Sequence, residues 1–166
     1  MPDKRYVLNA ENAAQKLHRM ALEIAENLSG DDAPLIFVGV RNSGTEIAEI
    51  VAGFAKEHLP NAIKVISVSL DKHNPNEVVL SEDIDLNGKN VIVMDDVSNS
   101  GKTLMYALKP LLRFHPKRIQ TLVLVERMHK FYPVKPDYVG CSVATTSQDF
   151  IKVEVENGKV AGAYIE

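Results

Sequence analysis

Apolar positions recur with helical spacing near the start of the chain, between Asn9 and Leu28. They follow one another at steps of three or four residues, which places them on one face of a helix. These positions are Ala13, Leu17, Met20, Ile24 and Leu28. Asn9 before the run and Gly30 after it are residue types that commonly begin and end helices. The pattern predicts a helix with one buried face over residues 9–28.

Short apolar runs separated by polar segments predict strands. The runs at 35–40, 91–94 and 119–125 are almost continuously apolar, as in strands buried on both faces of a parallel sheet. Residues 63–70 and 78–80 predict two more strands, joined by the polar turn 71–77. Together these runs predict a central sheet whose inner strands are covered on both sides.

Helical spacing follows two of these runs. Ser43 and Glu46 have the spacing of a capping box, and apolar residues continue the helical period to Phe54. A later helix is expected to kink or restart at Pro110, because proline lacks the backbone N–H that a helix interior needs. The positions expected to share a face of that helix are Leu104, Leu108, Leu111 and Leu112. Alternating strands and helices predict an α/β fold, a parallel sheet with helices on both faces.

The chain changes character after about residue 126. Residues 127–166 carry turn signals and one alternating stretch, IKVEVE, but no helical period. This pattern predicts a small C-terminal region of strands and loops appended to a core of about residues 30–126. A length of 166 residues fits one domain, so residues 1–166 are expected to fold as a unit.

Composition narrows the possible partners and compartment. There are 19 basic and 22 acidic residues, a net charge of −3, so the charge gives no general support for binding nucleic acid. A single cysteine, Cys141, excludes an internal disulfide and a cysteine-based zinc site and is expected to be a small packing residue. No apolar run approaches the roughly 20 residues that span a bilayer, and the first residues lack the apolar stretch of a secretory signal. We therefore expect a cytoplasmic protein without membrane association.

The segment most informative about chemistry is VIVMDDVSNSGKTLMYAL at 91–108. A predicted buried strand leads into Asp95 and Asp96, and a small polar loop, Ser98–Thr103, follows and opens a helix. Backbone N–H groups and hydroxyls in such a loop can surround a phosphate. The two carboxylates would repel a phosphate but can accept hydrogen bonds from neighbouring hydroxyls. A ribose 5-phosphate carries both kinds of group.

A nucleoside-triphosphate loop is excluded, because Asp96 stands where the Walker A pattern requires glycine. Acids at a strand end and small polar residues before a helix also occur without any ligand, as solvated and capping residues. A second loop, Gly39–Glu46, follows another predicted parallel strand. Two such loops at the carboxyl ends of parallel strands, where open α/β sheets bind ligands, favour a phosphorylated ligand.

The segment VIVMDDVSNSGKTL resembles the phosphoribosyl pyrophosphate (PRPP) signature of type I phosphoribosyltransferases, and the resemblance extends over about residues 35–140. It implies that Asp95 and Asp96 bind the ribose hydroxyls and that the following loop holds the 5-phosphate. It also implies that residues 40–44 bind pyrophosphate, with Arg41 contacting it and with a non-proline cis peptide in the loop. The residues expected to bind PRPP are Asp95, Asp96, Val97, Ser98, Asn99, Ser100, Gly101, Lys102 and Thr103, and those of the pyrophosphate loop are Val40, Arg41, Asn42, Ser43 and Gly44.

The segment RMHKFYPVKPDYVGCSV at 127–143 resembles two branches of that family: PyrR-like uracil phosphoribosyltransferases that also regulate pyrimidine genes, and hypoxanthine-guanine enzymes. The residues that this likeness places near the base are Arg127, Lys135, Tyr138 and Val139. Asn99 stands where the purine enzymes carry an acid, and an amide cannot act as a base, which disfavours the purine branch. The segment 71–82 is shorter than the mobile loop of the PyrR-like branch, whose Tyr-Arg pair is Asp71-Lys72 here.

The resemblance implies a transferase that moves ribose 5-phosphate from magnesium-bound PRPP to a nucleobase, with uracil favoured. Magnesium is expected to bind through PRPP and not through protein ligands alone. Hypoxanthine or guanine as the acceptor is one alternative, and a nucleotide-sensing RNA-binding regulator with little catalysis is another. The resemblance further implies a homodimer or a larger homo-oligomer.

Overall fold

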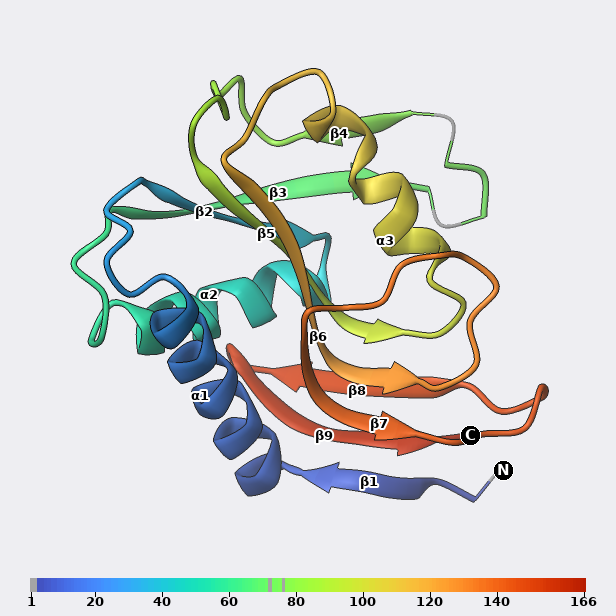
Figure 1. The fold of residues 1–166 in the computed structure, drawn as a ribbon. Coiled ribbons are helices and arrows are strands. Elements are labelled where there is room, and N and C mark those ends of the chain that lie inside the picture. The colour runs from blue at the N-terminus through green and yellow to red at the C-terminus, as the bar shows by residue number, and fades with distance from the viewer. Residues whose placement is uncertain (1–2, 72, 76) are drawn as a thin grey trace.

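The computed structural model describes residues 3–71, 73–75 and 77–166, so Lys72 of the Asp71-Lys72 pair lies outside the described residues. Its centre is a six-stranded sheet in the order β4-β3-β2-β5-β6-β7 (Figure 1). Five of these strands are parallel and only β4 is antiparallel to its neighbour. The strands are β2 (Leu35–Val40), β3 (Ile63–Leu70), β4 (Val78–Leu80), β5 (Asn90–Ser98), β6 (Arg118–Arg127) and β7 (Tyr138–Val143). The predicted parallel α/β fold is confirmed.

The inner strands form where the apolar runs predict them. Every residue of β2 is buried, and Val38 pairs with Ile66 of β3 and with Val93 of β5. The strand β5 is longer than the predicted run 91–94, because its pairing with β6 continues to Ser98. Asp95 and Asp96 therefore lie within the end of the strand, where the period of two decides which way each side chain points.

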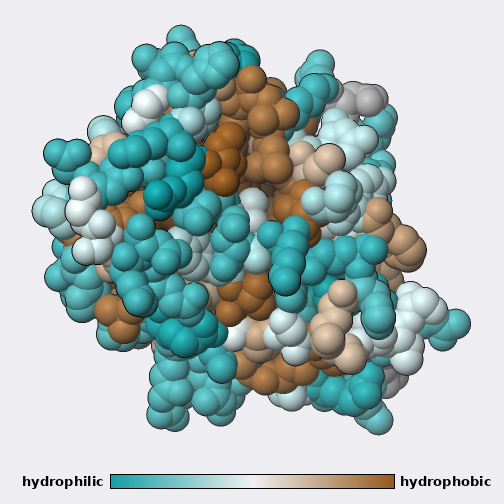
Figure 2. All heavy atoms as spheres, in the orientation of Figure 1, coloured by the Kyte–Doolittle hydropathy of each residue, from teal (hydrophilic) through white to brown (hydrophobic). Residues whose placement is uncertain are grey.

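Helices cover both faces of the sheet. The helices α1 (Ala10–Asn27) and α2 (Ser43–Ala55) pack on one face, and α3 (Lys102–Ala107) with a 3-10 turn, η1 (Lys109–Leu111), packs on the other (Figure 1). The amide N–H of Asn12 donates to Asn9 Oδ1 at 2.8 Å, which confirms Asn9 as the cap of α1. Polar residues cover most of the face seen in Figure 2, and apolar surface gathers near β4 and α3. The apolar helix faces point inward.

Two helix predictions are wrong in detail. The capping box fails because Asn42 occupies the N-cap and Ser43 is already the first helical residue. The later helix breaks at Pro110 as predicted, since α3 ends at Ala107 and Pro110 lies inside the 3-10 turn, but its predicted apolar face is wrong at one position. Leu112 is 71% exposed, so it does not share the buried face of Leu104 and Leu111. Proline interrupts the helical period that would have turned Leu112 inward.

A second, three-stranded antiparallel sheet joins the two ends of the chain, in the order β1-β9-β8 (Figure 1). Its strands are β1 (Arg5–Asn9), β8 (Ile151–Glu156) and β9 (Lys159–Ile165). The short strand β1, which precedes the first predicted helix, pairs along β9, with Arg5 opposite Ile165. Within residues 127–166, β7 extends the central sheet, while β8 and β9 form the second one.

Tyr138 anchors β7 inside the core, where it is only 1% exposed. Its hydroxyl donates to Gln120 Oε1 and accepts a hydrogen bond from Asn27 Nδ2, both at 2.9 Å. Burial raises the pKa of this phenol, and the hydrogen bond from Asn27 opposes that shift only in part. The folded protein therefore holds the phenolic proton more tightly than the unfolded chain does.

Replacing Tyr138 by phenylalanine is expected to lower the free energy of unfolding at pH 7 by about 1–2 kcal/mol, because the two part-buried hydrogen bonds of its hydroxyl, with Gln120 and Asn27, are lost. Above pH 10 the unfolded chain releases the tyrosine proton before the folded protein does, so wild-type stability falls as pH rises. The phenylalanine variant lacks this loss. Urea unfolding of both proteins should show that the difference between their free energies of unfolding is smaller above pH 10 than at pH 7. An equal difference at both pH values would contradict the raised pKa.

Candidate functional site

The two polar loops lie at the same edge of the central sheet. The strands β2 and β5 are parallel neighbours, with Gly39 opposite Met94, so the segments that follow them emerge side by side. Residues 40–44 run from the last residue of β2 into the start of α2, and residues 98–103 run from the last residue of β5 into the start of α3. The structure thus brings together the two segments that the sequence analysis selected, at the edge where open α/β sheets bind ligands.

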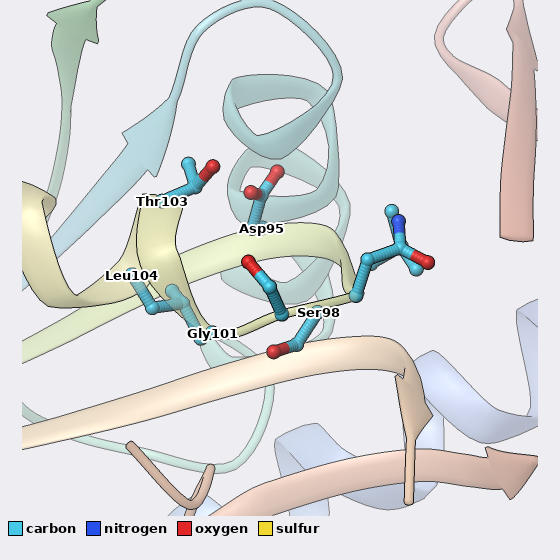
Figure 3. A pocket seen from close by; sticks show the side chains of 8 residues that line it. Asp95, Ser98, Gly101, Thr103 and Leu104 are labelled. Atoms are coloured by element: carbon cyan, nitrogen blue, oxygen red, sulfur yellow. The ribbon is translucent and has the colours of Figure 1, made fainter. Parts of the chain in front are cut away.

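A cavity opens at the end of β5, bounded on one side by the loop that leads into α3 (Figure 3). Asp95 and Ser98, from the end of the strand, and Thr103, from the start of the helix, line it. The residues that line the cavity are Asp95, Val97, Ser98, Asn99, Ser100, Gly101, Thr103 and Leu104. Carboxylate, hydroxyl and backbone groups meet there, which suits a ligand with both hydroxyls and an anionic group.

The two neighbouring acids have different positions. Asp95 is 2% exposed and lines the cavity, whereas Asp96 is 7% exposed and is not among the lining residues. Asp95 Oδ1 accepts the N–H of Asp96 at 2.9 Å, and Asp96 Oδ1 accepts the N–H of Val97 at 2.8 Å. These local hydrogen bonds fix both carboxylates. Consecutive strand residues point to opposite faces, so the geometry favours Asp95 as the acid that meets a ligand.

The loop after β5, residues 98–103, has the features of an anion site. Gly101 has φ 87°, a left-handed conformation that glycine adopts without strain. Ser98 is 3% exposed and its hydroxyl has no hydrogen-bond partner among the described protein atoms. Ser100 Oγ accepts the N–H of Lys102 at 3.2 Å, which keeps the loop tight. The unsatisfied Ser98 hydroxyl at the cavity wall indicates that a polar ligand completes this site.

The loop after β2 has the expected cis peptide, between Arg41 and Asn42. Val40 is buried, and Arg41 and Asn42 are exposed at the sheet edge. Gly44 lies directly against β5, because a β-carbon added to it would be 2.7 Å from the carbonyl oxygen of Met94. The start of α2 is therefore seated on the strand that carries Asp95. Contact of Arg41 with pyrophosphate stays a prediction.

The residues expected near a base are not brought together at the cavity. Tyr138 is buried in the core, because β7 pairs with β6 from Leu122 onward and this register places Tyr138 halfway along the sheet. This corrects the expectation that it faces a ligand. Val139 packs on the α3 side of the core, and Lys135 is exposed. Arg127 donates to the carbonyl oxygen of Thr146, which orients it toward the loop between β7 and β8.

Three residues beside the cavity were not predicted as site residues. The backbone of Ile151 in β8 exchanges two long hydrogen bonds, 3.4 and 3.5 Å, with the carboxamide of Asn99, and so links the second sheet to the loop. Glu126 is the next to last residue of β6 and forms a largely buried ion pair with Lys130. The sequence does carry a signal for Glu126, because an acid follows an apolar strand there, as Asp95 does after the strand before it.

Cys141 is half-buried in β7, as expected for a packing residue. Burial raises the pKa of its thiol, and the nearby charges of Lys16 and Arg19 oppose that effect only in part. Because the thiolate is the reactive form, we expect Cys141 to react slowly with a disulfide reagent at pH 7. Reaction in urea should be much faster. Equal rates in folded and unfolded protein would contradict the protected position.

Within residues 3–71, 73–75 and 77–166, no three His, Cys, Asp or Glu side chains cluster in a way that could hold a metal ion. No helix in the same residues is long and apolar enough to cross a membrane.

The chain has recognisable relatives among known proteins. Residues 5–156 match the model of the phosphoribosyl transferase domain family. The chain is 32% identical over 163 residues to the bifunctional protein PyrR of Actinobacillus pleuropneumoniae, covering 92% of this chain and 90% of that protein. It is 33% identical over 166 residues to the bifunctional protein PyrR of Pelotomaculum thermopropionicum, covering 93% and 90%.

Among solved structures, the hypoxanthine phosphoribosyltransferase of Trypanosoma cruzi superimposes with a TM-score of 0.81 at 15% identity, covering 98% of this chain and 97% of that one. A hypoxanthine-guanine phosphoribosyltransferase of Bacillus anthracis gives a TM-score of 0.71 at 21% identity, covering 91% and 87%. At sequence identities this low, the similarity to these two structures shows a shared fold only.

Proposed function

Because the chain belongs to the phosphoribosyl transferase family, we propose that it transfers ribose 5-phosphate from PRPP to uracil, releasing pyrophosphate. The cavity at the end of β5 carries this proposal, since it places the Asp95 carboxylate and the unsatisfied Ser98 hydroxyl around one space. Uracil is favoured over hypoxanthine and guanine by the PyrR proteins at 32–33% identity and by Asn99, which cannot serve as a base.

In the proposed complex the 5-phosphate lies in the loop 98–103, where hydroxyls and backbone N–H groups donate to its oxygens. Asp95 accepts a hydrogen bond from a ribose hydroxyl and fixes the sugar. The pyrophosphate extends toward residues 40–44 and Arg41. As the bond from C1′ to pyrophosphate breaks, a bond from C1′ to N1 of uracil forms and the N1 proton is released to water. Positive charge develops on the sugar and negative charge on the pyrophosphate, so catalysis rests on positioning and on stabilisation of these charges.

Magnesium fits this site as a partner of PRPP. Asp95, which lines the cavity, would offer a hard oxygen ligand of the kind that magnesium prefers, and the oxygens of PRPP would offer others. When bound, the cation would neutralise charge on the departing pyrophosphate. We expect activity to be lost on chelation with EDTA and restored by added magnesium. A homo-oligomeric state and a cytoplasmic location remain predictions.

The function is tested by measuring pyrophosphate release from magnesium-bound PRPP with uracil, hypoxanthine and guanine side by side, with a no-base control. The proposal expects release with uracil well above the other three reactions. Greater release with hypoxanthine or guanine would show that a purine, and not uracil, is the acceptor. If the protein binds PRPP but releases no pyrophosphate with any of the three bases, the transferase function would be contradicted and a nucleotide-sensing regulator would be favoured.

A further inference from the structure

The connection between β6 and β7 lies against the loop 98–103. The N–H groups of Phe131 and Tyr132 both donate to the carbonyl oxygen of Ser100, at 3.0 and 3.1 Å. A β-carbon added to Gly101 would be 3.2 Å from the carbonyl oxygen of Tyr132 and 3.8 Å from Cδ of Lys130. Residues 130–132 therefore form one wall against which the candidate phosphate loop is packed.

A buried ion pair holds that wall in place. Lys130 Nζ lies 2.8 Å from Glu126 Oε2, and Ser142 Oγ donates to Glu126 Oε1 at 2.8 Å. The side chains of Lys130 and Glu126 are only 14% and 11% exposed. By contrast, those of Lys64 and Glu82, an ion pair across β3 and the β4 segment, are 52% and 43% exposed. A largely buried pair is far less screened by water than an exposed one.

The acid of this pair is fixed to the sheet itself. The backbone of Glu126 lies between Ser98 of β5 and Ser142 of β7, its register partners, and its carboxylate accepts the hydroxyl of Ser142. Ser98 is also the residue that begins the candidate phosphate loop. The chain of contacts runs from the sheet to Glu126, from Glu126 to Lys130, and from residues 130–132 to Ser100 and Gly101.

We propose that Glu126 and Lys130 are positioning residues that set the conformation of the phosphate loop for the sugar phosphate. The inference rests on the proposed function for the identity of that ligand. Neither charge needs to touch the ligand, because the ion pair neutralises itself and acts through the backbone of Ser100 and Gly101. Loss of the pair loosens the loop and weakens its grip on the 5-phosphate, while the site for the base keeps its affinity.

The test compares Lys130→Met, which keeps the methylene groups near Gly101, with Lys130→Arg, Glu126→Gln and the double variant Glu126→Gln/Lys130→Met. Lys64→Met is the matched control, because it breaks the exposed ion pair with Glu82. We expect Lys130→Met to raise the KM for PRPP about ten-fold with the KM for the base unchanged. Lys130→Arg should recover most of the loss, and the double variant should resemble the Lys130→Met variant.

Hydrogen exchange of the Phe131 and Tyr132 amides gives a readout that needs no ligand. Faster exchange in Lys130→Met but not in Lys64→Met supports the positioning role, even if PRPP proves not to be the substrate. If Lys130→Met shows wild-type exchange and a wild-type KM for PRPP, the positioning role is overturned. A lowered melting temperature in that variant would then show that the ion pair only stabilises the fold. If wild type fails to bind PRPP, the proposed function fails and exchange alone decides this inference.

Discussion

Replacing Asp95 by asparagine is expected to lower kcat/KM for PRPP by about ten- to a hundred-fold, the range for a lost hydrogen bond to a charged group. Asp95 is the acid that lines the cavity, and its partner in the proposed complex is a ribose hydroxyl. The amide keeps the shape of the side chain and can still accept the N–H of Asp96. The melting temperature should therefore change little, while steady-state kinetics at varied PRPP report the loss.

Asp96→Asn is the matched control for this prediction. Its side chain is nearly as buried as that of Asp95, and its carboxylate also accepts a neighbouring N–H, but it does not line the cavity. We expect a smaller loss of activity in this variant than in Asp95→Asn. A larger loss in Asp96→Asn than in Asp95→Asn would show that Asp96 is the acid that contacts the sugar. Near-wild-type kinetics in both variants would show that neither acid binds the ribose.

Replacing Gly44 by alanine is expected to reduce both stability and activity. The new β-carbon would lie 2.7 Å from the carbonyl oxygen of Met94 and 3.1 Å from Asp95 Oδ1, so α2 must move away from β5. Overpacking of this kind costs about 1–3 kcal/mol of stability. A displaced α2 also moves the loop 40–44 away from Asp95, and misplacement of about 1 Å can reduce a rate about a hundred-fold. Urea unfolding and steady-state kinetics measure the two effects.

Gly53→Ala provides the control within the same helix. A β-carbon at Gly53 would meet nothing within 4 Å, so the added methyl group fits. Alanine is the better helix former, and the variant should gain about 0.5–1 kcal/mol of stability with unchanged activity. If Gly44→Ala behaved like Gly53→Ala, the close seating of α2 on β5 would be contradicted.

The parallel sheet and the loop 98–103 could be predicted because their signals are local. Apolar runs specify buried strands wherever they occur, and the acids, hydroxyls and glycine of the loop are adjacent in the sequence. The difference between Asp95 and Asp96 also follows from the period of two, once β5 is known to extend to Ser98. That extension depends on pairing with β6, which the sequence of β5 does not contain.

What could not be predicted depends on contacts between distant segments. The strand β1 forms because β9 lies beside it, and five residues with little pattern gave no indication of that pairing. The buried position of Tyr138 was not predicted, because the direction of its side chain depends on the register of β7 on β6. The ion pair of Glu126 and Lys130 was missed for a related reason, since its effect on the loop passes through the backbone of Ser100.

Calorimetric titration of magnesium-bound PRPP into wild type and into Asp95→Asn, with ribose 5-phosphate as a competitor, tests whether the end of β5 binds a sugar phosphate. We expect one binding site per chain in wild type, displacement by ribose 5-phosphate, and binding at least about ten-fold weaker in the variant. Equal affinity in both proteins, or no binding to wild type at all, would contradict a sugar-phosphate site at the end of β5.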